Sequence, residues 1–206
     1  AGLIQLSGWQ GNTDFYDPMC GSGTIIIEAA LFACNIPVNI NRKSFAFDKW
    51  KDWDESLFAT IKNSQLKKIS NPTIQIKGSD KAPSAIEKAL QNVENANLSD
   101  FISLEKKDFF QVEKETKGPL HLLTNPPYGE RLEGDMNVLY QGIGDAFKQS
   151  FPNTQAWMIS SNMEALKFVG LRPSRKIKLF NGKLETRLLL YPIYEGTKRI
   201  HKLKED

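Results

Sequence analysis

Two short motifs combine residue types that suit ligand binding and catalysis. The first, DPMCGSGT, runs from Asp17 to Thr24, and the second, NPPY, runs from Asn125 to Tyr128. In the first motif an acid precedes Gly21 and Gly23, and glycines let a ligand approach the backbone where a helix begins. In the second motif two prolines hold an amide and an aromatic side chain in a stiff segment. The pair predicts a binding loop and a rigid ledge that positions a reacting group.

Both motifs follow apolar runs of strand length, which alternate with segments of helix length. This alternation predicts an α/β fold with a mostly parallel sheet. The expected strands span residues 13–17, 74–80, 102–104, 120–124 and 156–160, and the expected helices span 25–34, 83–96, 136–149 and 163–168. Two further strand-like runs, 176–180 and 184–194, surround Asn181-Gly182, a dipeptide favoured in type I′ hairpins. A seven-stranded, Rossmann-like sheet that ends in an antiparallel hairpin is similar to that of class I methyltransferases.

Three acids follow the first three expected strands. The loop after Asp17 is neither GxGxxG nor a P-loop, and an acid followed by Gly-Ser-Gly is typical of an S-adenosylmethionine loop. Asp80 is placed to accept hydrogen bonds from ribose hydroxyls, with Lys81 beside it; an N-cap for the next helix is the other interpretation of Asp80. Asp108 is placed to accept a hydrogen bond from the adenine amino group.

The NPPY segment suits methyl transfer to an exocyclic amine. The side-chain oxygen of Asn125 and the carbonyl of Pro126 would accept the two N–H bonds of that amine and stabilise positive charge as it develops on nitrogen. Tyr128 would stack on an extruded base, and Pro127 would keep the ledge stiff. A plain turn that ends a strand explains the prolines alone, but not this order of four residues.

Residues 37–71 form a long connection that is rich in aromatic residues. We expect a helical insert that covers one edge of the core; a flap that contacts substrate is the alternative.

The overall composition narrows the class of protein. The chain has 206 residues, 40% of them hydrophobic, which fits one large domain or one domain with an appendage. No apolar run reaches the roughly 20 residues of a membrane span, and two cysteines indicate neither a disulfide framework nor a zinc site. We therefore expect a soluble, cytoplasmic protein without a metal. The net charge is +3, but residues 165–206 hold eleven Lys/Arg against four Asp/Glu. This basic end suits a polyanionic partner or is a solvated tail.

Longer segments resemble one known family. AGLIQLSGW, DPMCGSGTIIIEAA, FAFDKW, NPPYGERL and NGKLETRLLLY are together similar to the catalytic domain of THUMP-associated RNA guanine-N2 methyltransferases, the RlmL type of the UPF0020 family. The resemblance covers nearly the whole chain. It implies transfer of a methyl group from S-adenosylmethionine to guanine N2 in 23S ribosomal RNA.

The resemblance also assigns residues. The cofactor would contact Asp17, Pro18, Met19, Cys20, Gly21, Ser22, Gly23, Thr24, Asp80, Lys81 and Asp108, and the target amine would contact Asn125, Pro126, Pro127 and Tyr128. Glu130 and Arg131 would position RNA or brace the loop. No THUMP region precedes Ala1, so we expect a fragment that recognises RNA poorly, and Thr186 stands where cysteine is more usual. NPPY alone leaves open an adenine-N6 methyltransferase of DNA or RNA, and a non-catalytic RNA-binding module is a further alternative.

Overall fold

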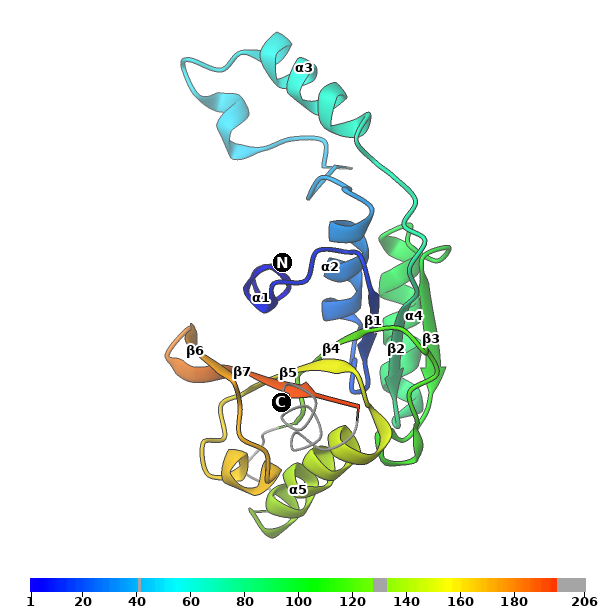
Figure 1. Ribbon diagram of the computed structural model, residues 1–206. Helices are drawn as coiled ribbons and strands as arrows, with labels where there is room; N and C mark the ends of the chain where they lie inside the picture. Colours follow the sequence, from blue (N-terminus) through cyan, green and yellow to red (C-terminus); the bar gives the residue numbers. More distant parts are fainter. Residues whose placement is uncertain (41, 128–132, 196–206) are drawn as a thin grey trace, which may run out of the picture.

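The computed structural model describes residues 1–40, 42–127 and 133–195, and its elements follow the predicted α/β order (Figure 1). The helices are α1 (Gly2–Ser7), α2 (Thr24–Ala33), α3 (Glu55–Leu66), α4 (Pro83–Asn95) and α5 (Glu133–Ser150), with 3₁₀ turns η1 (Ala46–Lys49), η2 (Phe109–Gln111) and η3 (Ala165–Val169). The strands are β1 (Asp14–Asp17), β2 (Ile76–Asp80), β3 (Ile102–Lys106), β4 (Leu120–Thr124), β5 (Thr154–Ser160), β6 (Arg175–Asn181) and β7 (Leu184–Ile193).

All seven strands join one sheet in the order β3-β2-β1-β4-β5-β7-β6. Strands β1 to β5 are parallel, whereas β7 runs antiparallel to both β5 and β6. The predicted class I methyltransferase sheet with its C-terminal hairpin is therefore confirmed. The strand order reverses at β1: β2 and β3 are added on one side of it, and β4 and β5 on the other. Ligands of open α/β sheets bind at such a switch point, beyond the carboxyl ends of the strands.

The sheet is covered on both faces by apolar side chains. Alternation along β1 sends Phe15 into the cluster with α1, α2 and α4, and Tyr16 into the cluster with η2, α5 and η3. Trp9 and Trp157 are buried in the first cluster, at 3% and 2% exposure. Both faces are thus fixed by packing, and the loops at the carboxyl edge stand on a rigid base.

Three local features differ from the sequence prediction. The hairpin pairs Asn181 with Leu184, so its loop is Gly182-Lys183 rather than Asn181-Gly182. Only Gly182 has a positive φ, of 61°, which is the pattern of a type II′ turn and not of type I′. The expected helix at 163–168 is the 3₁₀ turn η3, and the short helix α1 was not predicted.

The insert between α2 and β2 does not cover an edge of the core. Figure 1 shows η1 and α3 projecting beyond the end of α2, away from the sheet. Its aromatic rings pack on one another instead: Phe47 stacks on Phe45 with centroids 4.8 Å apart and contacts Trp53 at 5.0 Å. The predicted cover of a core edge was wrong, because these rings contact one another rather than core residues and no residue of η1 or α3 is buried.

Candidate functional site

The loop after β1 connects the strand to the N-terminus of α2, as its glycines predicted. Gly21 and Gly23 have φ values of 54° and 84°, in the left-handed region that favours glycine. Gly23 is the N-cap of α2, and neither a capping side chain nor an acid in the first turn occupies this helix end. A Cβ atom on Gly23 would lie 3.3 Å from the Ala89 side chain, so the loop is also closely packed. The N–H groups at this helix end are available to a polar ligand.

Asp17 ends β1 and is 1% exposed. Its Oδ1 accepts the Met19 N–H at 3.2 Å, and no basic side chain in the described part of the chain forms an ion pair with it. Burial raises the pKa of Asp17 to about 7; the Thr124 hydroxyl and the Met19 N–H lower it, and the Asp80 carboxylate raises it. Thr124 Oγ1 is itself buried without a hydrogen bond of good geometry in the described residues, so its effect on Asp17 is that of a nearby dipole. A ligand with a positive charge would supply the cationic partner that this buried carboxylate lacks.

Asp80 lies at the end of β2 and links two loops. Its Oδ2 accepts the N–H of Gly21 at 3.1 Å and its Oδ1 accepts the N–H of Ala82 at 2.9 Å. The N-cap interpretation of Asp80 is wrong, because Ala82 is the cap of α4 and no side chain caps it. Asp80 instead holds the glycine loop against the end of β2, while Lys81 beside it is exposed.

Asp108 follows β3 and caps η2, where its Oδ1 accepts the Phe110 N–H at 3.1 Å. Its other oxygen is available in a hollow that Lys81 also lines. The three acids follow the sheet order: Asp17 ends β1, Asp80 ends β2 and Asp108 comes just after β3, and these strands are successive neighbours in the sheet. The strand order therefore places the three acids in a row along the carboxyl edge of the sheet.

The remaining residues of the first loop differ in their exposure to solvent. Pro18 and Cys20 are buried, Met19 is half-buried, and Ser22 and Thr24 are exposed. Burial raises the pKa of the Cys20 thiol to about 12, with smaller contributions from Asp17 and Asp80. The thiol is therefore protonated at neutral pH and is unsuited to act as a nucleophile.

The ledge after β4 meets this loop from the other side of β1. Asn125 is exposed, Pro126 is buried and Pro127 is exposed. Strand β4 pairs directly with β1, and Asn125 lines one cavity together with Thr24 of the first loop. Tyr128, Glu130 and Arg131 lie outside the described residues, as does the basic end from residue 196.

The cavity at Asn125 also includes residues that the sequence reasoning missed. Glu28 of α2 and Thr186 of β7 both line it, and Thr186 is 3% exposed. The sequence carries one signal for Glu28: it is the only charge in the apolar helix TIIIEAALFA. The sequence singled out Thr186 only as a position where cysteine is more usual, and it did not predict that this hairpin residue lies beside Asn125.

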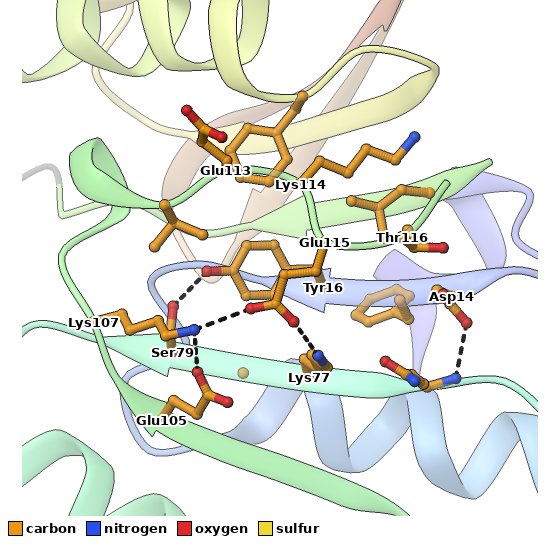
Figure 2. Close-up of a pocket in the computed structure, with 16 residues that line it drawn as sticks. Asp14, Tyr16, Lys77, Ser79, Glu105, Lys107, Glu113, Lys114, Glu115 and Thr116 are labelled. Atoms are coloured by element: carbon orange, nitrogen blue, oxygen red, sulfur yellow. Dashed lines mark hydrogen bonds and ion pairs between the residues drawn. The ribbon is translucent and has the colours of Figure 1, made fainter. Parts of the chain in front are cut away.

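A second hollow lies on the α5 side of the sheet (Figure 2). Its floor holds the Tyr16 hydroxyl, 2.7 Å from Ser79 Oγ, and Glu115 pairs with both Lys77 and Lys107 across it. None of the predicted site residues lines this hollow. The ion pairs instead fasten the segment after Asp108 to the sheet, on the face of β2 opposite α4.

Within the described residues, no group of three or more His, Cys, Asp or Glu is suited to hold a metal. Nor does that part of the chain contain a helix long and apolar enough to cross a membrane. Cys20 and Cys34 are both free and buried.

Curated relatives of this chain are ribosomal RNA large subunit methyltransferases K/L. The protein from Psychromonas ingrahamii is 38% identical over 203 residues, covering 94% of this chain and 27% of the relative. The protein from Shewanella frigidimarina is 33% identical over 206 residues, covering 97% of this chain and 29% of the relative. The chain thus spans less than a third of the length of these relatives.

Solved structures share the fold at similar identity. SMU.472, a provisionally assigned methyltransferase crystallised with SAH, superposes with a TM-score of 0.86 at 30% identity, over 95% of this chain and 52% of that one. A predicted N6-adenine-specific DNA methylase from Listeria monocytogenes str. 4b F2365 gives a TM-score of 0.79 at 30% identity, over 95% of this chain and 50% of that one.

A family model covers most of the chain, and its match includes both motifs. The model is that of UPF0020, described as the RMKL-like methyltransferase domain, and it matches residues 1–189. The resemblance seen in the sequence motifs is confirmed, and the chain belongs to the UPF0020 family of RMKL-like methyltransferase domains.

Proposed function

We propose that this chain transfers a methyl group from S-adenosylmethionine to the exocyclic N2 amine of a guanine in 23S ribosomal RNA. One observation carries the proposal: the loop from Asp17 to Thr24 and the ledge at Asn125 follow paired strands and line a common edge of the sheet. The names of the curated relatives support ribosomal RNA as the substrate.

The described residues fit this cofactor. S-adenosylmethionine carries positive charges on its ammonium and sulfonium groups, and Asp17 is a buried carboxylate without a cationic partner among the described residues. Asp80 and Asp108 supply acceptor oxygens for the ribose hydroxyls and the adenine amine, in the order of strands β2 and β3. The structure in complex with SAH at 30% identity supports the same assignment. When bound, the cofactor supplies an electrophilic methyl group.

The protein's own part in catalysis is to orient the amine and stabilise charge. Asn125 Oδ1 and the Pro126 carbonyl accept the two N–H bonds of the target amine, which directs the nitrogen lone pair away from the ring. Positive charge grows on this nitrogen as it attacks, so these acceptors bind the transition state more strongly than the ground state. The prolines hold the acceptors fixed, and Tyr128, outside the described residues, is assigned to stack on the base.

A separate RNA-binding region and a cytoplasmic location are part of the same proposal. The relatives are more than three times as long as the part matched here, which leaves room for such a region in proteins of this kind. Ribosomal RNA as substrate favours the cytoplasm.

Adenine-N6 methylation is the second candidate, because the Listeria relative is named for that activity. Methylation assays with this chain, and with the longest natural chain that contains it, separate the two. Labelled S-adenosylmethionine is incubated with unmodified large-subunit ribosomal RNA or with DNA, and the product nucleoside is identified by mass spectrometry. N2-methylguanosine is expected; N6-methyladenine alone would overturn the proposal. If calorimetry shows no cofactor binding by either chain, the non-catalytic RNA-binding module becomes the better assignment.

A further inference from the structure

The cavity beside Asn125 has the size of a small-molecule site. Its volume is about 420 Å³, within the range of roughly 300–1,000 Å³ common for such sites. Four parts of the fold enclose it: α1, the first turns of α2, the end of β5 and the β6–β7 hairpin. Asn125 lies at its edge, so a base whose amine contacts Asn125 extends into this space.

Most of the cavity wall is apolar. Leu3 and Leu6 contribute from α1, Ile25 from α2, and Leu179 and Phe180 from the hairpin. Phe180 is 65% exposed, and Lys178 Nζ lies over its ring at 5.2 Å from the centroid, so the ring is accessible at the cavity wall. Walls of this kind favour a flat, largely apolar ligand with a polar edge, which is the character of a nucleobase.

Glu28 is the one carboxylate among the described residues that line this cavity. It lies one helical turn after Thr24, on the same face of α2. Its side chain is 31% exposed, and its ion-pair partner in the described residues is the amino group of Ala1, at 3.1 Å. Wherever further residues precede Ala1, that amino group is a peptide nitrogen without the charge. The carboxylate of this cavity-lining residue then retains acceptor capacity.

We infer that Glu28 reads the Watson–Crick edge of the target base by accepting the N1–H of guanine. This inference rests on the proposed function, because it places the base amine at Asn125. In guanine the N1–H is directly adjacent to the N2 amine, so both donors lie on one edge and meet acceptors from the ledge after β4 and from α2. In adenine N1 is a hydrogen-bond acceptor, and a carboxylate facing it is repelled. Glu28 thus selects guanine over purines without an N1–H, while Asn125 performs the positioning for transfer.

The test compares two bases that share the reacting amine. An RNA substrate is assembled with guanine, or with 2,6-diaminopurine, at the nucleotide found to be methylated. Diaminopurine keeps the 2-amine but has no hydrogen on N1. We expect kcat/KM of the unaltered protein to be at least tenfold higher for guanine, because losing one charged hydrogen bond and facing a lone pair disfavours the analogue.

The variant E28Q keeps the shape of the side chain and replaces one acceptor oxygen with an NH₂ donor. We expect its preference for guanine over diaminopurine to fall at least tenfold, while cofactor affinity by calorimetry changes less than twofold. E87Q is the control, since Glu87 is an exposed acid on α4 away from the cavity, and its base preference should equal that of the unaltered protein. E28A is the second variant should E28Q fail to fold, and it should also lose the preference.

The outcomes separate this inference from the proposed function. If no guanine is methylated at N2, the proposed function fails. If guanine is methylated at N2, but the unaltered protein uses diaminopurine equally well or the Glu28 variants keep the full preference, the inference about Glu28 is overturned and the proposed function stands.

Discussion

Replacing Asp17 with asparagine should change stability and cofactor binding in opposite directions. Asp17 is fully buried without a cation in the described residues, so its charge opposes folding in the ligand-free protein. The same charge favours a cationic cofactor. Asparagine keeps an oxygen that can accept the Met19 N–H, so D17N removes mainly the charge.

The size of the stability effect follows from the pKa. Moving the pKa of Asp17 from 3.8 to about 7 corresponds to about 4 kcal/mol, at about 1.4 kcal/mol for each tenfold change in proton affinity. This is an upper bound for the cost of the ionised form, because the asparagine amide is also a buried polar group. We expect ligand-free D17N to be more stable at pH 8 by about 1 to 3 kcal/mol, a rise in Tm of roughly 3 to 10 °C.

The pH dependence gives this prediction a distinctive shape. Between pH 3.8 and about 7 the folded protein holds a proton on Asp17 that the unfolded chain has released, so the stability contributed by this group falls as pH rises. The advantage of D17N should therefore be near zero at pH 4, grow through this window and level off above pH 7. Denaturant unfolding of both proteins at several pH values measures the difference directly.

Calorimetry with S-adenosylmethionine supplies the second half of the test. Affinity of the unaltered protein should rise from pH 6 to pH 8 as Asp17 ionises, and D17N should bind at least tenfold more weakly at pH 8 with little pH dependence. D14N is the matched control: Asp14 is at the opposite end of the same strand and accepts the Gln75 N–H through an oxygen that asparagine retains. The reasoning is refuted if D17N destabilises the ligand-free protein equally at pH 5 and pH 8, or if it binds cofactor as tightly as the unaltered protein.

Three further predictions test the ledge, the packing and the core. Asn125→Ala should lower turnover by roughly a hundredfold with cofactor affinity nearly unchanged, because it removes an acceptor used mainly in the transition state; an equal loss of both would contradict this. Gly144→Ala should destabilise the protein by about 3 kcal/mol or more in denaturant unfolding, since its Cβ would lie 1.7 Å from the Val169 carbonyl oxygen, whereas Gly2→Ala, with open space around it, should be neutral or stabilising. Burial lowers the pKa of His121 to about 4, so the protein should lose stability as pH falls from 6.5 to 4, and His121→Asn should flatten that loss in unfolding curves measured across this range.

Local patterns in the sequence were sufficient to predict most elements of the sheet and helices. The run from Leu120 to Thr124 is rich in leucine because β4 is buried at every position, and its boundaries match the prediction. Pro83 marks the first turn of α4 because a missing N–H costs nothing there. Glycines and prolines likewise identified the loop at Asp17 and the ledge at Asn125, since these residues act on their own backbone and need no distant partner.

Features that depend on distant partners were decided only by the tertiary structure. The aromatic insert projects from the sheet because Phe45, Phe47 and Trp53 pack on one another, and their spacing is equally compatible with covering a core edge. Asp80 holds Gly21 across a separation of 59 residues instead of capping its own helix.

The candidate site shows the same division. The sequence alone determined which residue types carry the chemistry, because loop and ledge are contiguous motifs. It did not determine that Glu28 and Thr186 would share a cavity with Asn125, since that depends on where the tertiary structure places the β6–β7 hairpin relative to α1 and α2. Side-chain periodicity reports whether a residue is buried, whereas the identity of its neighbours across the chain follows from strand order and packing.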